Sequence, residues 1–552
     1  MIDLHVHSCC SDGTLTPEEL VDLAMEKGLT AMALTDHDTM EGTKAIQEYA
    51  DRLRAQGKKN VPEIIPGIEL STERDGKDVH VVGLYVNQDA PDFKKYIKNF
   101  VDSRDKRNEV MCERLRDNGV DITMEELLSR FPGAVITRAH YARLMMEKGY
   151  VRCLPDAFDK YIGDHAPCYV PREKVTPEQA VELILKADGI PVLAHPILYN
   201  LSDRKLESLV SDLKEKGLLG IEAVYSTYSP ADERKIRALA NKYRLLLSGG
   251  SDFHGKNKDR IDLGTGLGNL CVPEEFLDKI KLAGRNVLFS DLDGTLFLKD
   301  STISSEMHRA LKTMTDKGYR FVINSGRPLA SVMERVVNLG FNFSNMFIIS
   351  NNGGLIYDCE NKKIIKDYRL SQDTIRKVVA MAVEARLHVH SYTENEIVGF
   401  EDDDELKFYR ERIHMPFIKT DDIAGCLPQG SFKVQIISLD NIPALAALKD
   451  KILNALSDEV DAVFSNDQYL EIVPKGVSKG DAMLYLANWF PVSRSRLFAA
   501  GDEHNDMTMI QYAGTGIAMS NGCEDLKAAA DIVTLRDNDH DGLLEVIEKY
   551  FV

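Results

Sequence analysis

The chain has 552 residues, of which 44% are hydrophobic and 28% charged, a composition that predicts several ordinary folded domains rather than disordered or fibrous segments. Asp and Glu outnumber Lys and Arg by 87 to 68, and the resulting net charge of −19 disfavours stable binding to duplex DNA. No apolar run approaches the roughly 18 residues of a membrane span, and the first residues indicate a strand rather than a signal peptide, so we expect a cytoplasmic protein without membrane contact.

The nine cysteines are spread from Cys9 to Cys523 without any C-x-x-C spacing. This pattern indicates neither a disulfide framework nor a thiolate zinc site. We therefore expect reduced thiols.

From residue 1 to about 283, short apolar runs alternate with helical patterns. After a strand at the start of the chain, the expected strands lie at 29–34, 63–68, 80–86, 190–194 and 245–247. Strands separated by helices predict a parallel α/β sheet, in which functional groups gather at the carboxyl ends of the strands. The helix-rich stretch from about 92 to 177 predicts an insertion that covers one side of the site.

Nine polar residues with metal-ligand chemistry lie in this first half, mostly at or near strand ends. They are His5, His7, Asp12, His37, Glu69, His80, His195, Asp252 and His254. Nitrogen and carboxylate donors without cysteine suit Zn²⁺, Mn²⁺ or Fe²⁺, and nine ligands exceed the needs of one ion. The alternative is a core of satisfied histidines, but six buried imidazoles without metal would leave many polar atoms to satisfy. Clustered ions predict phosphoester hydrolysis.

The ordered motifs of this half resemble the PHP (polymerase and histidinol phosphatase) family. They are Asp3-Leu-His-Val-His-Ser, Leu34-Thr-Asp-His-Asp-Thr39, Gly67-Ile-Glu-Leu-Ser71, Leu193-Ala-His-Pro196 and Gly250-Ser-Asp-Phe-His-Gly255. The resemblance covers residues 1–283 and implies a distorted (β/α)7 barrel with a trinuclear site. It further implies one ion on His5, His7, Glu69 and Asp252, a second on Glu69, His80 and His195, and a third on Asp12, His37 and His254.

The insertion carries a pattern similar to one branch of that family, which contains nucleoside 3′,5′-bisphosphate phosphatases and 5′-to-3′ exoribonucleases that act on short RNA. The substrate-binding residues implied are Arg104, Arg107, Asn108, His140 and Arg172. Guanidinium groups can bind phosphate oxygens in a bidentate way. The alternative for Arg104 and Arg107, three apart on an expected helix, is a solvated charged face.

A second alternation of strands and helices runs from Asn286 to the end of the chain. Its motifs are Asp291-Leu-Asp-Gly-Thr295, Ser325-Gly-Arg-Pro328, Ser478-Lys-Gly480 and Gly501-Asp-Glu-His-Asn-Asp506. They resemble the Cof-like sugar-phosphatase branch of the haloacid dehalogenase (HAD) superfamily over residues 286–552. The resemblance implies a Rossmann-like core.

The residue types in these motifs suit phosphoryl transfer. Asp291 is expected to attack phosphorus, while Asp293 protonates the leaving oxygen and later activates water. Asp502 and Asp506 would complete a Mg²⁺ site with Asp291 and the backbone carbonyl of Asp293. The expected phosphoryl-binding and orienting groups are Ser325, Lys479 and Asn505. Lys475 is the alternative to Lys479 as the phosphoryl-binding lysine.

Residues from about 355 to 470 predict a C2-type α/β cap over the phosphate site, with an alternating strand at 432–436. Substrate choice would reside in this cap. His388 and His390 form another His-x-His pair there. We interpret them as strand surface without carboxylate partners, and not as a metal site.

The sequence therefore predicts a two-module phosphoesterase. The barrel would use Mn²⁺ or Zn²⁺, with Fe²⁺ as a further option, on nucleotides or short single-stranded RNA. The second module would use Mg²⁺ on small phosphorylated metabolites. In the alternative, one module is catalytic and the other is a metal-dependent ligand-binding or regulatory module. Histidinol phosphate is an alternative substrate for the barrel.

Overall fold

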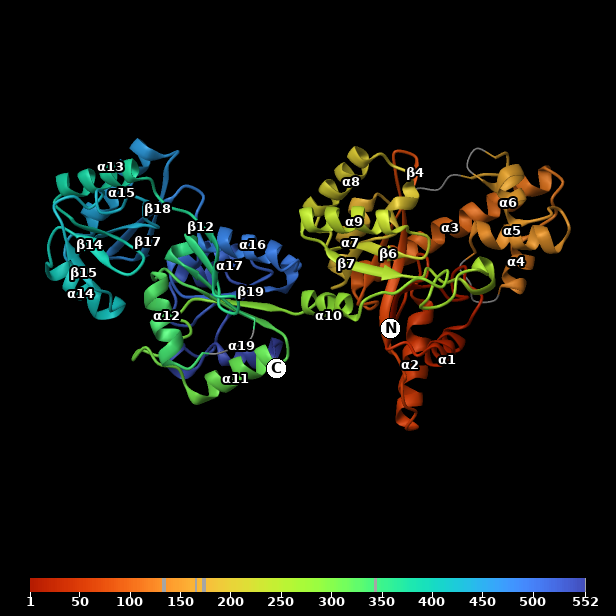
Figure 1. Ribbon diagram of the computed structural model, residues 1–552, viewed down its shortest axis with the longest axis horizontal. Helices are drawn as coiled ribbons and strands as arrows, with labels where there is room; N and C mark the ends of the chain where they lie inside the picture. Colours follow the sequence, from red (N-terminus) through yellow and green to blue (C-terminus); the bar gives the residue numbers. More distant parts are fainter. Residues whose placement is uncertain (132–135, 164–165, 171–174, 342–344, 552) are drawn as a thin grey trace. The chain divides into compact units, whose positions relative to one another are not determined.

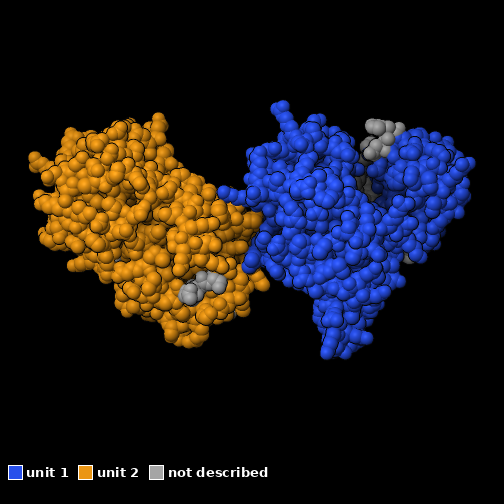
Figure 2. Space-filling model, viewed as in Figure 1, with its two compact units in different colours: residues 1–284 blue, residues 285–552 orange. Residues whose placement is uncertain are grey.

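The computed structural model describes residues 1–131, 136–163, 166–170, 175–341 and 345–551, apart from the side chains of residues 99–105, 412 and 466. The chain divides into two compact units, residues 1–284 and 285–552 (Figures 1 and 2). Each unit has hydrophobic cores of its own. Within the described ranges, no helix combines the length and the apolar character needed to cross a membrane.

A seven-stranded sheet organises the first unit, and its strand order follows the chain. The strands are β1 (Ile2–Val6), β2 (Ala31–Leu34), β3 (Glu63–Arg74), β4 (Lys77–Leu84), β5 (Ile190–Leu193), β6 (Gly220–Tyr225) and β7 (Leu246–Gly250). Strands β1 to β3 and β5 to β7 pair in parallel, as predicted. A bridge between Val6 and Phe253 returns the chain after β7 to β1, so the sheet forms a nearly closed barrel.

Strand β4 departs from the predicted parallel arrangement. It runs antiparallel to both β3 and β5. The reason is a two-residue turn at Asp75-Gly76, where both residues have positive φ, 53° and 72°, the conformation of a tight hairpin turn. The hairpin brings His80 on β4 to 2.9 Å from Glu69 on β3.

Most helices of the first unit follow its strands. They are α1 (Pro17–Lys27), α2 (Glu41–Ala55), α7 (Pro177–Lys186), α8 (Asp203–Glu215), α9 (Pro230–Tyr243) and α10 (Glu274–Ala283), with short 3₁₀ turns at Pro196–Tyr199 and Gly255–Lys258. Thr16 precedes helix α1 as its N-cap, and its side chain forms a capping box with Glu19. Helix α7 begins with the same arrangement of Thr176 and Gln179.

The helical insertion lies between β4 and α7. It comprises α3 (Pro91–Asp117), α4 (Met124–Arg130), α5 (Arg138–Glu147), α6 (Leu154–Ala157) and a π-helical turn at Phe158–Ile162. Its side chains form a small core of their own around Met111, Leu115 and Tyr141. The insertion is therefore packed as a subdomain.

The second unit contains an eight-stranded sheet in the order β12-β11-β10-β9-β8-β19-β20-β21. Its strands are β8 (Val287–Ser290), β9 (Arg320–Asn324), β10 (Met346–Ser350), β11 (Leu355–Asp358), β12 (Lys363–Asp367), β19 (Leu497–Gly501), β20 (Thr515–Ala518) and β21 (Ile532–Val533). The chain moves outward from β8 to β9 and later returns on the other side as β19. Ligands of open α/β sheets bind at such a reversal of strand order.

The helices of this core are α11 (Ser305–Asp316), α12 (Leu329–Asn338), α16 (Lys479–Trp489), α17 (Met507–Tyr512), α18 (Glu524–Ala529) and α19 (Leu544–Tyr550). Short 3₁₀ turns lie at Asn351–Gly353, Arg494–Arg496, His504–Asp506 and Asn538–His540. Strands β8, β9 and β19 are adjacent, so the residues that follow them meet at one edge of the sheet.

A separate six-stranded sheet forms the cap, in the order β15-β14-β13-β16-β18-β17. Its elements are α13 (Gln372–Glu384), β13 (His388–Tyr392), β14 (Ile397–Gly399), α14 (Asp404–Ile413), β15 (Phe417–Lys419), β16 (Val434–Ile437), α15 (Ile442–Leu456), β17 (Val460–Asn466) and β18 (Tyr469–Pro474). Figure 1 shows α13, α14 and α15 grouped with these strands. The predicted start of the cap at 355 is too early, because β11 and β12 hydrogen-bond to the core sheet instead.

Gly250 permits the close approach of β7 to β1. A Cβ atom at this position would lie 2.5 Å from both the backbone nitrogen and the Cβ of His5. We predict that Gly250→Ala lowers the stability of the first unit by about 1–3 kcal/mol, since the core cannot absorb the overlap without moving His5. Differential scanning calorimetry should show a lower transition temperature. Gly284→Ala is the control, because its nearest neighbouring atom would be 3.4 Å away; equal transition temperatures for the two variants would contradict the prediction.

Candidate active sites

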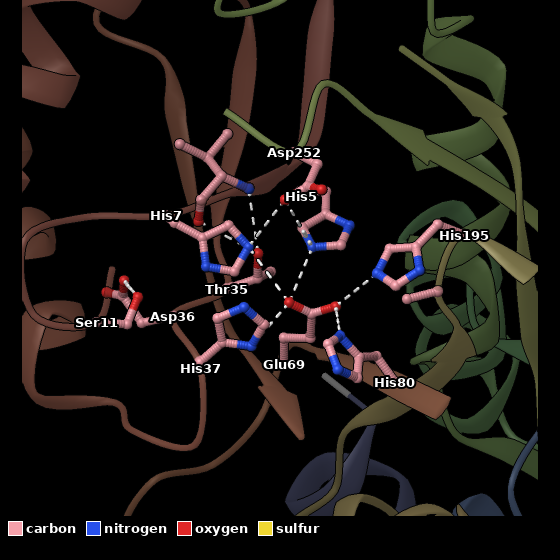
Figure 3. Close-up of polar contacts among 12 residues, drawn as sticks. His5, His7, Ser11, Thr35, Asp36, His37, Glu69, His80, His195 and Asp252 are labelled. Atoms are coloured by element: carbon pink, nitrogen blue, oxygen red, sulfur yellow. Dashed lines mark hydrogen bonds and ion pairs between the residues drawn. The ribbon is translucent and has the colours of Figure 1, made fainter. Parts of the chain in front are cut away.

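Glu69 occupies the centre of the first site, and its carboxylate faces five imidazoles (Figure 3). Oε1 lies 2.9 Å from His80 Nδ1 and 3.0 Å from His195 Nε2. Oε2 lies 3.1 Å from His37 Nδ1, and 3.3 Å from Nε2 of both His5 and His7. These side chains come from β1, β3, β4 and the segments after β1, β2 and β5, so the strand ends converge on one carboxylate.

Two further carboxylates border this cluster. Asp252 Oδ1 lies 3.3 Å from both His7 Nε2 and His254 Nδ1. Asp12 Oδ1 lies 3.2 Å from His254 Nε2, and its Oδ2 lies 3.8 Å from His37 Nε2. All nine predicted residues therefore lie in one cluster. Four groups of three or four of them place their ligand atoms within 4.8 Å of one another.

Burial and charge act in opposite directions on these groups. Burial raises the pKa of Glu69, yet the charges of His37, His5 and His80 hold that pKa well below its usual range. Burial lowers the pKa of His7, but Asp252 and Glu69 outweigh it and raise the pKa to about 9. For His37, burial dominates and lowers the pKa to about 4. The carboxylate of Glu69 therefore stays ionised at the centre of the cluster.

The donor set fits divalent metal ions. Five imidazole nitrogens are buried and have no partner with hydrogen-bonding geometry among the described residues: His5 Nε2, His7 Nδ1 and Nε2, His37 Nδ1 and His195 Nδ1. Buried polar atoms of this kind normally have partners. Imidazole nitrogens and carboxylate oxygens directed at shared points are the donor set that zinc, manganese and iron accept.

Several supporting residues escaped the sequence analysis. Glu222 on β6 bonds His5 Nδ1 at 3.1 Å and accepts a hydrogen bond from the His195 backbone nitrogen at 2.7 Å. Tyr225 and Lys258 each donate to Asp252 Oδ2 at 2.6 Å. The sequence feature that could have identified Glu222 and Tyr225 was the run 221–225, which forms most of β6. Such partners orient the ligands and fix their protonation.

One cavity connects this cluster to the insertion. Asp12, His37 and His80 line it together with Arg107 and Arg138. Of the predicted substrate-binding residues, Arg107 therefore lies at the site, and Arg138 joins it. Arg172 and the side chain of Arg104 lie outside the described residues.

Asn108 and His140 have structural roles in the insertion. The Asn108 amide donates to the Ile136 carbonyl at 3.1 Å, and His140 Nδ1 accepts from the Thr137 backbone nitrogen at 3.0 Å, which caps α5. Both are buried, and neither lines the described part of the cavity. The prediction that they bind substrate thus finds no support in their positions.

In the second unit, three carboxylates and one lysine meet where β8 and β19 end. Asp291, Asp502 and Asp506 place oxygen atoms within 4.8 Å of one another. Lys479 Nζ donates to Asp291 Oδ1 at 2.7 Å and to Asp506 Oδ1 at 2.5 Å, and it is fully buried at the start of α16. The rival Lys475 instead pairs with Asp461. Geometry therefore favours Lys479.

Neighbouring groups fix this cluster. The Asn324 amide donates to the Lys479 carbonyl at 3.0 Å, which gives a reason for an amide before Ser325. Thr295 donates to Asp502 at 2.8 Å. Ser325 lines the cavity at the end of β9, where Asn505 also lies and donates to Asn352 at 3.1 Å.

Arg327 is a site residue that received no role from the sequence. Its Nε and Nη2 donate to the two carboxylate oxygens of Asp293 at 2.6 and 2.7 Å. Such a bidentate pair fixes the orientation of the carboxylate. The sequence feature that could have identified Arg327 was its position in the motif Ser325-Gly-Arg-Pro328.

The carboxylates of this cluster repel one another. Burial raises the pKa of Asp291 to about 7, although Lys479 lowers it. Burial and the charges of Asp506 and Asp291 raise the pKa of Asp502 well above its usual range. A hard divalent cation with oxygen ligands, such as Mg²⁺, fits this donor set because it would neutralise the clustered negative charge.

The side chains of the cap histidines are buried, which corrects their interpretation as surface residues without carboxylate partners. His390 is fully buried on β13, and His388 Nδ1 lies 2.7 Å from Asp403 Oδ2. The partner escaped notice because Asp403 is fifteen residues away and becomes adjacent only when α14 packs beside β13.

Both halves of the chain match known families. The model of the PHP domain matches residues 3–136, and that of the haloacid dehalogenase-like hydrolases matches residues 288–547. The 5′-3′ exoribonuclease Rnm of Escherichia coli (strain K12) is 35% identical over 252 residues, which are 46% of this chain and 84% of that protein. The chain belongs to the PHP family.

Its second unit is a haloacid dehalogenase-like hydrolase. A 3′,5′-nucleoside bisphosphate phosphatase of Chromobacterium violaceum is 32% identical over 271 residues, 48% of this chain and 90% of that protein. A haloacid dehalogenase-like hydrolase of Bacteroides thetaiotaomicron is 29% identical, with a TM-score of 0.45, over 48% of this chain and all of that one. The chain is thus a hydrolase of phosphate esters, and both families imply divalent metal ions.

Lys479 in the HAD unit offers a sharp test of the site geometry. Lys479→Met leaves the buried carboxylates of Asp291 and Asp506 without their cation, so we predict a stability loss of about 3–5 kcal/mol and loss of Mg²⁺-dependent hydrolysis of 4-nitrophenyl phosphate. Chemical denaturation and the chromogenic assay measure both. Lys475→Met removes a half-exposed pair with Asp461 and should cost at most about 1 kcal/mol. Greater damage from Lys475→Met would overturn the assignment.

Proposed function

We propose that the chain carries two independent phosphoesterases. The PHP unit hydrolyses phosphate esters of nucleotides or short single-stranded RNA, and the HAD unit hydrolyses small phosphomonoesters of the sugar-phosphate type. The observation that carries the proposal is the presence of two separate donor clusters, one around Glu69 and one around Asp291, that share no residue. Each cluster lines a cavity of its own.

Cationic groups beside the metal ligands support a nucleotide or RNA substrate for the PHP unit. Arg107 and Arg138 line the same cavity as His37 and His80. Arginine forks bind phosphate oxygens in a bidentate way, so a second phosphate could be held there while the first lies at the ligand cluster. The relatives named as an RNA exonuclease and a nucleoside bisphosphatase agree with this assignment.

The nine ligands of the PHP unit would hold three ions in the arrangement that the family resemblance implies. Bound divalent ions would activate a water molecule and neutralise charge on the attacked and leaving oxygens. The chain itself contributes orientation. Glu222 fixes His5 and the His195 backbone, and Tyr225 with Lys258 fixes Asp252.

In the HAD unit, Asp291 is the proposed nucleophile. It follows β8 directly, and its Oδ1 is held by Lys479. Lys479 and Ser325 would bind phosphoryl oxygens, and Asp293 would protonate the leaving oxygen and then activate the hydrolytic water. Both carboxylate oxygens of Asp293 accept hydrogen bonds from Arg327. Asp293 therefore has to release at least one of these hydrogen bonds when it takes up a proton.

We predict that the two activities separate by mutation. His195→Ala should reduce Mn²⁺-supported hydrolysis of adenosine 3′,5′-bisphosphate by at least about 100-fold, the scale of loss that outer-shell changes at metal sites already produce, and spare Mg²⁺-dependent hydrolysis of 4-nitrophenyl phosphate. Asp291→Asn should do the reverse. Phosphate release from the two substrates measures both effects. Loss of both activities in either folded variant would refute independent sites.

If the HAD unit forms a covalent aspartyl phosphate, the variant Asp293→Asn should release a burst of 4-nitrophenol. In Asp293→Asn, 4-nitrophenol leaves readily without an acid, but hydrolysis of the phosphoenzyme lacks its base. Stopped-flow absorbance should therefore show one equivalent of 4-nitrophenol released rapidly, followed by a slow phase. Asp291→Asn is the control and should show no burst. Slow linear release from Asp293→Asn, with no phosphorylated protein after acid quench, would favour direct attack by water.

A further inference from the structure

A buried ion pair of the cap faces the phosphatase cavity. Lys433 lies just before β16, Glu471 lies on the neighbouring β18, and both side chains are almost fully buried. Lys433 Nζ donates to Glu471 Oε1 at 2.8 Å, and both residues line the cavity that contains Asp291 and Asp293. Because both charges belong to the cap, they neutralise each other without any group of the core.

The ammonium of Lys433 makes two further hydrogen bonds, and one of them leaves the cap. It donates to Gln435 Oε1 at 3.2 Å and to the backbone carbonyl of Gly326 in the core at 2.9 Å. A lysine ammonium has three protons, and with the bond to Glu471 all three are used. Lys433 thus connects the cap to the segment between β9 and α12.

The carboxylate of Glu471 reaches the core as well. Its Oε1 also accepts from the Ser465 hydroxyl at 3.0 Å, and its Oε2 accepts from the side-chain amide of Asn352. Asn352 lies in the 3₁₀ turn after β10, in a left-handed conformation with a φ of 54°. The ion pair therefore holds two segments of the core, one through each of its charged groups.

Three consecutive carbonyl groups of segment 325–327 are held by these contacts. The backbone nitrogen of Asn352 donates to the Ser325 carbonyl at 3.2 Å, and that of Asn351 donates to the Arg327 carbonyl at 3.0 Å. Lys433 donates to the carbonyl between them, that of Gly326. The cap thus supplies the middle contact, and through Asn352 it supports one of the outer contacts.

Segment 325–327 in turn fixes Asp293. The Gly326 carbonyl belongs to the peptide group that precedes Arg327, so holding this planar group restricts the backbone of Arg327. The Arg327 side chain donates to both carboxylate oxygens of Asp293 at 2.6 and 2.7 Å. Lys433 is therefore connected to Asp293 through one peptide group and one guanidinium.

We propose that Lys433 and Glu471 are positioning residues for Asp293: the pair holds segment 325–327 so that Arg327 directs the carboxyl group of Asp293 at the leaving oxygen. The inference rests on the proposed phosphatase function of this unit. In that reaction the Asp291 carboxylate forms a bond to phosphorus, the bond from phosphorus to the leaving oxygen breaks, and Asp293 transfers its proton to that oxygen. A misdirected acid slows this step most for a leaving group that needs the proton.

Phenyl phosphate and 4-nitrophenyl phosphate are matched probes for this step, because they differ only in the nitro group, and 4-nitrophenol leaves readily without an acid. The quantity measured is kcat/KM with Mg²⁺, to which the later hydrolysis of a phosphoenzyme does not contribute. In Lys433→Met, kcat/KM should fall about tenfold further for phenyl phosphate than for 4-nitrophenyl phosphate. This is a part of the roughly 10²- to 10⁴-fold acceleration that a general acid contributes.

A charge-balanced variant guards against misfolding. Lys433→Met alone leaves the buried Glu471 carboxylate without its cation, which can prevent folding, whereas Lys433→Met combined with Glu471→Gln removes both charges. The combined variant should show the same discrimination between the two esters. Lys377→Met is the control and should behave as wild type, because it breaks a half-exposed cap pair with Glu459 that lies outside the residues lining the cavity.

A double-mutant cycle tests whether Lys433 acts through Arg327. Arg327→Met should discriminate between the two esters at least as strongly as Lys433→Met, and adding Lys433→Met to it should change the ratio of the two kcat/KM values no further. A further change in the ratio would contradict the connection through Arg327.

Two other outcomes separate this inference from the function on which it rests. Equal losses of kcat/KM for both esters in the Lys433 variants would overturn the inference, because a general structural role or direct binding of the phosphate affects both esters alike. Failure of the wild type to hydrolyse either ester faster than Asp291→Asn would refute the proposed function of the unit, and the inference with it.

Discussion

The need to neutralise buried carboxylates shapes both units of this protein. Glu69 is almost completely buried and faces five imidazoles, because strands from most of the barrel end around it. A carboxylate removed from water costs several kcal/mol unless opposite charge compensates it. The barrel therefore has to bring its histidines to the strand ends, and the same arrangement creates the donor set for metal ions. The outer partners Glu222, Tyr225 and Lys258 then hold this donor set in place.

The second unit meets the same constraint with fewer cations. Lys479 is fully buried between Asp291 and Asp506, and Asn324 holds its backbone. Burial raises the pKa of Asp291 to about 7, and the single ammonium of Lys479 does not offset this burial together with the neighbouring carboxylates. This residual negative charge is what a magnesium ion would compensate. Lys475 is exposed and pairs with Asp461, so it does not contribute to this cluster.

Each site has an α/β scaffold and an added part that faces it. In the PHP unit, the insertion after β4 places Arg107 and Arg138 in the cavity of the ligand cluster. In the HAD unit, the cap places Tyr409 and Lys433 in the cavity of Asp291. In the proposed function, the strand ends hold the groups that would act on phosphorus, whereas the added parts would contact the rest of a substrate. Selectivity could then vary without disturbing the buried charges.

The sequence by itself determined the two α/β units, the nine residues of the barrel cluster and the four motifs of the second unit, because short buried strands followed by polar residues form local patterns. The antiparallel β4, the late start of the cap and the supporting Glu222 were decided only by tertiary structure. Strand direction depends on one hairpin turn, and sheet membership depends on pairing between distant segments. The same holds for His388 and His390, whose spacing is visible in the sequence. Asp403, the hydrogen-bond partner of His388, and Tyr409, whose ring lies beside that of His390, become their neighbours only when α14 packs beside β13, because these contacts require proximity in space.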